Sequence, residues 1–132
     1  MSWIFHVTAA TDWEAAVAAG EYRLSTRGKT LVEQGFIHAS TAEQVEGVAN
    51  AVYRGSDGLV VVVIDANRVS SEIRYERPLG SEEEFPHIYG PLNIDAVVGT
   101  FPLDPGTDGL FNFHLSEDAI LALYLAAGEG QD

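Results

Sequence analysis

The sequence predicts an α+β fold, with a curved or split, mainly antiparallel sheet and two or three helices. Segments with the composition of strands outnumber helical segments, and two helical patterns fall early in the chain. This order differs from the regular strand–helix alternation of a doubly wound parallel sheet. The most apolar run, GLVVVVID at residues 58–65, is short and rich in β-branched residues. We expect it to be a central strand covered on both faces.

The first strand is predicted at residues 3–8, WIFHVT, which are apolar apart from His6 and the closing Thr8. Its composition is typical of a strand that enters a core. Further short strands are expected at residues 22–25, 73–76 and 96–103.

Two early helices are predicted, over residues 11–20 and 41–53. Each follows a hydroxyl residue with a glutamate three positions later, the spacing of a capping box; the pairs are Thr11 with Glu14 and Ser40 with Glu43. Gly20 and Gly55 suit the C-terminal ends of these helices. We therefore expect Ser40, in the segment GFIHAS, to be an N-cap, which is a more common role for such a serine than ligand contact.

The remaining segments are assigned from composition and punctuation. Residues 85–92, FPHIYGPL, lie between two prolines, and we expect an ordered loop there or, alternatively, the wall of a ligand site. Other expected features are an irregular or partly helical stretch at 26–34, an acidic loop at 80–85, a turn at 104–109, a helix at 116–127 and a frayed tail. This divides the chain into a single domain over residues 1–115 and a C-terminal helix and tail over residues 116–132.

Composition narrows the classes of function. The 132 residues contain no apolar run near the ~20 residues that would span a bilayer. The N-terminus lacks the pattern of a signal peptide, so a cytoplasmic location is expected. The absence of cysteine excludes disulfides, thiol nucleophiles and zinc–thiolate sites.

The charge of the chain points away from nucleic acids. Seven Lys and Arg stand against twenty Asp and Glu, for a formal net charge of −13. Such a chain repels phosphates unless basic residues gather locally, and they do so only slightly, as in the group of Arg23, Arg27 and Lys29. A small-molecule ligand or a basic protein partner fits better.

Histidines are the main candidates for chemistry. Three of the four precede a hydroxyl residue by two positions: His6 with Thr8, His38 with Ser40, and His87 with Tyr89. Residues i and i+2 of a strand share a face, so each pair can present an imidazole and a hydroxyl to one side. The alternative for each is a partly buried ring that bonds the backbone; for the fourth, His114, we consider only this one.

Spacing argues against several other chemistries. No HxH or HExxH pattern suggests a metal site, no GxSxG suggests a serine hydrolase, and no glycine-rich phosphate loop is present. For His38 we expect a position at the mouth of a cleft, with its ring facing His6 across the sheet. Alanine at His38 should then leave the free energy of unfolding within ~1 kcal/mol and weaken ligand binding. We expect the same of His6, whose strand is more enclosed.

Three stretches resemble the bacterial domain of unknown function 952 family: IFHVT; GFIHASTAEQVEGVANAVY with LVVVVIDANRV; and FPHIYGPLNIDAVV. The resemblance runs from about residue 3 to about residue 113. The family's usual Cys between the histidine and the serine is Ala39 here, so no thiol role is carried over. No activity is established for that family.

A more distant resemblance joins FHVT and FIHAS to motifs of ADP-ribosyltransferases and RNA 2′-phosphotransferases. It implies an ADP-ribosyltransferase-like fold, with NAD as the candidate substrate and no resident cofactor identified. Catalytic roles would fall on His6, His38 and Tyr89. Ligand-binding roles would fall on Thr8, Arg23, Arg27, Ser40 and His87. The glutamate often found in the third motif is missing here, which weighs against transfer to proteins.

Two functions therefore remain open. The first is an ADP-ribosyltransferase-like enzyme that acts on NAD or a related nucleotide, orienting the ribose and stabilising charge as the nicotinamide bond breaks. The second is a non-catalytic module that binds a nucleotide or another small anion. The missing glutamate favours the second, and the histidine–hydroxyl pairs favour the first.

Overall fold

The computed structural model describes residues 2–25, 29–113, 118–122 and 125. The strands are β1 (Trp3–Ala9), β2 (Glu21–Tyr22), β3 (Ile37–His38), β4 (Leu59–Asp65), β5 (Glu72–Glu76), β6 (Phe85–Tyr89), β7 (Leu92–Asn93) and β8 (Val97–Leu103). The helices are α1 (Ala10–Ala19), α2 (Leu31–Gln34) and α3 (Val45–Val52), with 3-10 turns η1 (Ala66–Arg68) and η2 (Ile94–Ala96). The strands form antiparallel sheets in the orders β1–β4–β8, β2–β7 and β3–β6–β5. The predicted α+β class and mainly antiparallel, split sheet are confirmed.

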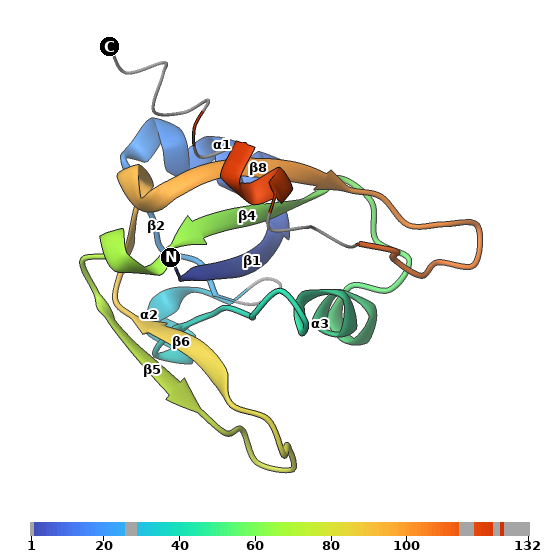
Figure 1. Ribbon diagram of the computed structural model, residues 1–132, viewed down its shortest axis with the longest axis horizontal. Coiled ribbons are helices and arrows are strands. Elements are labelled where there is room, and N and C mark those ends of the chain that lie inside the picture. The colour runs from blue at the N-terminus through green and yellow to red at the C-terminus, as the bar shows by residue number, and fades with distance from the viewer. Residues whose placement is uncertain (1, 26–28, 114–117, 123–124, 126–132) are drawn as a thin grey trace.

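Strand β4 is the centre of the largest sheet, as its apolar sequence predicts. It lies between β1 and β8 (Figure 1). Val61 and Val63 pack into the hydrophobic cluster that includes α3, whereas Val62 and Ile64 pack into a second cluster on the other face. Burial on both faces explains why the strand is continuously apolar rather than alternating.

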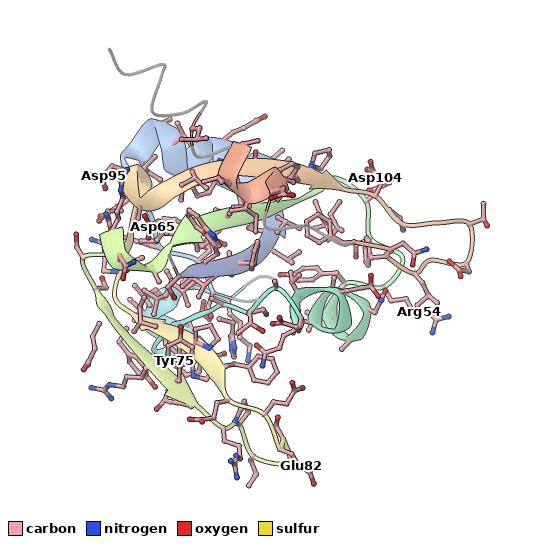
Figure 2. All side chains as sticks on the ribbon, in the orientation of Figure 1. Arg54, Asp65, Tyr75, Glu82, Asp95 and Asp104 are labelled. Atoms are coloured by element: carbon pink, nitrogen blue, oxygen red, sulfur yellow. The ribbon has the colours of Figure 1, made fainter. Side chains whose placement is uncertain are left out.

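The β3–β6–β5 sheet meets the β1 edge at one point. The backbone groups of Phe5 and Ser40 pair there, with N···O distances of 2.8 and 2.7 Å. Away from this junction the hairpin of β5 and β6 diverges from the β1–β4–β8 sheet (Figure 1). Figure 2 shows Glu82 at the far end of the acidic loop that joins the two strands. The junction places the end of β3 directly beside β1.

Both predicted capping boxes are wrong, because neither Thr11 nor Ser40 is the N-cap of a helix. Ser40 is held in the bridge to Phe5, and α3 begins only at Val45, without a side-chain cap. Helix α1 starts at Ala10, before Thr11, and the Ala10 amide donates to the Gly58 carbonyl 2.8 Å away. A carbonyl from the neighbouring loop thus replaces the expected cap.

A capping box does form within residues 26–34, the stretch expected to be irregular or partly helical. The Thr30 hydroxyl accepts from the Glu33 amide at 3.2 Å, and the Glu33 carboxylate accepts from the Thr30 amide at 3.0 Å. This pair opens the short helix α2, which ends at Gly35 with φ of +92°. The turn after α2 leads the chain directly into β3.

The stretch from Phe85 was expected to be a loop, but residues 85–89 are strand β6. Pro86 lies opposite Tyr75 in the pairing with β5, and its carbonyl accepts from the Ala39 amide 3.0 Å away, just beyond β3. Gly90 then has φ of +151°, and a Cβ there would lie 2.4 Å from the Ser71 hydroxyl oxygen. The glycine therefore allows the chain to pass Ser71 closely as it leaves the strand.

The other predicted strands agree with β2, β5 and β8 to within a few residues. Residues 118–122 are helical, whereas much of the predicted C-terminal helix, and His114, fall outside the described residues. Among the described residues, every helix is too short or too polar to span a lipid bilayer.

Candidate functional site

One pocket brings together His6, His38 and His87, three residues from three different strands. Its volume is about 320 Å³. Among the described residues, its lining is Phe5, His6, Val7, Ser25, Lys29, Gln34, His38, Ala39, Ser40, Val48, Val52, Tyr53, Pro78, Phe85 and His87. This volume is at the lower end of the range for small-molecule sites, roughly 300–1,000 Å³.

Strand register explains how residues so far apart in sequence meet. His38 on β3 is paired with His87 on β6, so both side chains lie on one face of that sheet. Their neighbours Ile37 and Ile88 are also paired and are fully buried on the other face. The bridge between Phe5 and Ser40 then brings the end of β3 to His6.

His6 is buried, with about 4% of its surface exposed, and both of its ring nitrogens are bonded. Nδ1 donates to the backbone carbonyl of His38. Nε2 lies 2.7 Å from the Tyr22 hydroxyl, which in turn lies 2.9 Å from the Thr8 hydroxyl. Burial lowers the pKa of His6 to about 4. The ring is therefore neutral at pH 7. It carries its proton on Nδ1, and Nε2 can only accept a hydrogen bond.

His38 is half-buried, and its ring contacts lie on the β6 side of the pocket. The ring lies edge-on to His87, with centroids 5.2 Å apart, and edge-on to Phe36 at 4.7 Å. Burial, together with the nearby charges of His87 and Lys29, lowers the pKa of His38 to about 4. It is the His38 backbone carbonyl, rather than its ring, that bonds His6.

His87 has one bonded and one unpartnered nitrogen. Nδ1 lies 2.8 Å from Oε1 of Glu76, and the Tyr89 hydroxyl donates to the same oxygen. The hydrogen bond from Tyr89, and to a smaller extent that from His87, lowers the pKa of Glu76 below its ordinary value. Phe36 stacks on the ring at 4.0 Å. Nε2 is buried and has no hydrogen-bond partner among the described residues. Such an atom in a pocket wall is a candidate for ligand contact.

The charge of the pocket wall differs from that of the whole protein. None of the lining residues that the structure describes carries a carboxylate, and Lys29 contributes a cation. The chain as a whole has a formal net charge of −13. The pocket is therefore a local exception in which an anionic or strongly polar ligand meets no like charge within the wall.

The other predicted site residues divide into three groups. Ser40 lines the pocket. Thr8 and Tyr89 lie outside its wall, but each shares a bonding partner with the histidine two residues before it. Arg23 pairs with Glu21 at 2.6 Å, also away from the pocket wall, and Arg27 falls outside the described residues.

Two residues that organise the histidines were missed from the sequence. Glu76 ends the predicted strand at residues 73–76, and the alternation of side chains along that strand puts it on the face of Arg74. The sequence therefore indicated the face on which Glu76 lies, but only the pairing of β5 with β6 shows that this face carries His87. Tyr22 had no local signal, because only the tertiary fold brings its hydroxyl to His6. Within the described ranges, no three His, Asp or Glu side chains gather closely enough to hold a metal ion.

Comparison with known proteins gives a family and a fold. The sequence profile of a family described as "Protein of unknown function (DUF952)" matches residues 7–100. No curated protein matches. The crystal structure of protein CC0527 from Caulobacter crescentus is similar at 29% identity and a TM-score of 0.74, over 84% of this chain and 94% of that chain. The crystal structure of a double mutant of CC0527 gives the same values. Its solution NMR structure is similar at 30% identity and a TM-score of 0.68, over 83% and 91% of the two chains.

Proposed function

For this chain, which belongs to the DUF952 family, we propose that the pocket lined by His6, His38 and His87 binds a small nucleotide-type ligand. The observation that carries the proposal is the unpartnered Nε2 of His87 in the wall of this pocket. A buried polar atom without a hydrogen-bond partner makes the folded protein less stable, and a ligand that bonds this atom would remove that cost.

The composition of the wall supports an anionic ligand with an apolar or aromatic part. Lys29 and the hydroxyls of Ser25 and Ser40 are polar features, whereas Phe85, Val48 and other apolar residues supply most of the wall. Mixed walls of this kind bind ligands that combine a ring with a charged or hydroxylated group. The ligand would therefore contact His38, His87 and Ser40.

In its finer form, the proposal is an ADP-ribosyltransferase-like enzyme acting on NAD or a related nucleotide. The FHVT and FIHAS motifs that carry the resemblance supply His6 and His38, and both line the pocket. Phe85, rather than Tyr89, is then the aromatic wall beside the nicotinamide, because Tyr89 lies outside the lining. His6 holds the backbone of His38 in place.

A thermal unfolding experiment tests the binding. NAD, ADP-ribose and nicotinamide are each added at millimolar concentration, and a ligand at ~100 times its dissociation constant stabilises the protein by ~2.7 kcal/mol. Val48→Trp, which fills the pocket from α3, should abolish the shift. Ala51→Trp, at an exposed position of the same helix outside the pocket wall, should keep it. No shift with any of the three ligands would contradict the proposal.

A second candidate is a binding module without catalysis, and two observations favour it. Both nitrogens of His6 are bonded within the protein, and the lining includes, within the described part of the chain, no glutamate that could stabilise an oxocarbenium-like state. The two candidates differ in one measurement. An enzyme would release nicotinamide from NAD over hours, whereas a binding module would return NAD intact.

A further inference from the structure

Glu76 and His87 have the arrangement of a proton-accepting pair. The Glu76 carboxylate lies 2.8 Å from Nδ1 of His87 and can only accept a hydrogen bond, so the ring proton is held on Nδ1. In neutral imidazole the other nitrogen, Nε2, then carries a lone pair. His87 lines the pocket and Glu76 does not. The ring therefore separates the carboxylate from the pocket, with Nε2 on the edge away from Glu76.

The surroundings keep this pair in one geometry. Phe36 stacks on the imidazole at 4.0 Å with an angle of 19° between the planes. The Tyr89 hydroxyl donates to the carboxylate oxygen that accepts from His87. The guanidinium of Arg74 lies 4.5 Å above the Tyr89 ring. Held in this way, Glu76 is a positioning residue that fixes the tautomer and orientation of the His87 ring.

We propose that His87, oriented by Glu76, accepts a hydrogen bond and then a proton from a hydroxyl group in the pocket. The hydroxyl belongs to the ligand or to a bound water. The O–H bond breaks, an N–H bond forms at Nε2, and the resulting imidazolium lies against the Glu76 carboxylate. General bases of this kind contribute typically 10²–10⁴-fold to a rate.

With NAD as the ligand, the inference rests on the proposed function and specifies its chemistry. The oxygen that has lost its proton bonds to the ribose carbon as the bond from that carbon to nicotinamide breaks. Nicotinamide leaves as a neutral molecule, and the proton remains on His87. Water as the nucleophile gives ADP-ribose, whereas the hydroxyl of a second bound ligand gives an O-glycoside of ADP-ribose with that ligand, so the product identifies the source of the hydroxyl.

The first arm of the test uses the free protein and does not depend on NAD. Long-range ¹H–¹⁵N spectra of the imidazole rings near neutral pH should show His87 protonated on Nδ1 and not on Nε2. Glu76→Gln should change this tautomer equilibrium. Glu72→Gln is the matched control, because Glu72 lies on the same strand and bonds Arg74. A proton on Nε2 in the wild type, or an unchanged spectrum in Glu76→Gln, would overturn the inference.

The second arm measures nicotinamide release from NAD. Glu76→Gln and His87→Asn should each reduce the rate on the order of 100-fold, with Glu72→Gln unchanged. In His87→Gln, an amide nitrogen or oxygen near the Nε2 position should retain binding but not the rate. If Glu76→Gln releases nicotinamide at the wild-type rate, the dyad is not the base. If NAD neither binds nor reacts while the tautomer follows Glu76, the NAD assignment fails, and the dyad stands as a hydroxyl-binding site.

Discussion

The β1 side and the β6 side of the pocket each contribute a histidine with about 4% of its surface exposed. On the β1 side, His6 has a partner for each nitrogen, from the His38 carbonyl and the Tyr22 hydroxyl. On the β6 side, His87 has Glu76 on one nitrogen and no described partner on the other. Equal burial therefore accompanies different roles. Under the proposed function, the number of unsatisfied nitrogens, rather than exposure, distinguishes the structural histidine His6 from the proposed ligand-binding histidine His87.

The largest expected effect that separates the two sides is on stability. His6→Ala removes a ring that links β1, β2 and β3 and leaves the Tyr22 hydroxyl with Thr8 as its remaining partner. The cavity and the lost hydrogen bonds together should cost on the order of 3 kcal/mol in the free energy of unfolding. Urea unfolding beside the wild type measures this. The structure thus replaces the sequence-based expectation of ~1 kcal/mol for His6, and a loss within ~1 kcal/mol would restore it.

The sequence predicted the central strand and the antiparallel pattern more accurately than it predicted caps and loops. Strand β4 could be assigned because its seven residues are all apolar except the last. In a small domain, such a short apolar run is typical of a buried strand. Ser40 could not be placed correctly, because its backbone pairs with Phe5, 35 residues earlier in the chain. Local capping signals cannot show such a competing long-range partner.

The roles of Tyr22 and Glu76 show a second limit of the sequence. Each bonds a histidine and a hydroxyl residue two positions later, and each belongs to a strand other than that of the pair. The spacing of His6 with Thr8 and of His87 with Tyr89 therefore did predict that each pair has a common side. The spacing gave no information about which side chain would bond each pair, because that side chain comes from a neighbouring strand and depends on the strand order.

Acid should weaken the protein through the β1 side. The pKa of His6 is about 4 in the folded state and 6.5 in the unfolded reference. Between these values the unfolded chain binds a proton that the folded chain does not, so stability falls as pH drops from about 6.5 to about 4 and His6 adds no further loss below that. The difference corresponds to about 3 kcal/mol. The lowered pKa of His38 acts in the same direction.

The control for this prediction is His6→Gln, which keeps a polar side chain but cannot titrate. The free energy of unfolding is measured by urea titration at several pH values between 4 and 7. The slope against pH should be smaller in His6→Gln than in the wild type, although the variant is less stable throughout. Equal slopes in the two proteins would show that His6 has the same pKa in the folded and unfolded states and would remove the distinction based on its neutral ring.

The smallest stability effect is expected at His38, which lies between the two sides. Its backbone carbonyl bonds His6, and alanine keeps that bond, whereas the ring contacts Phe36 and His87 in the half-exposed wall. His38→Ala should therefore change the free energy of unfolding by no more than ~1 kcal/mol. The same change should weaken the binding of whichever nucleotide stabilises the wild type, because the ring forms part of the pocket wall. Urea unfolding followed by ligand titration measures both quantities on one sample. A loss as large as that in His6→Ala, with unchanged affinity, would assign His38 to the structural side and leave His87 as the histidine of the pocket that meets a ligand.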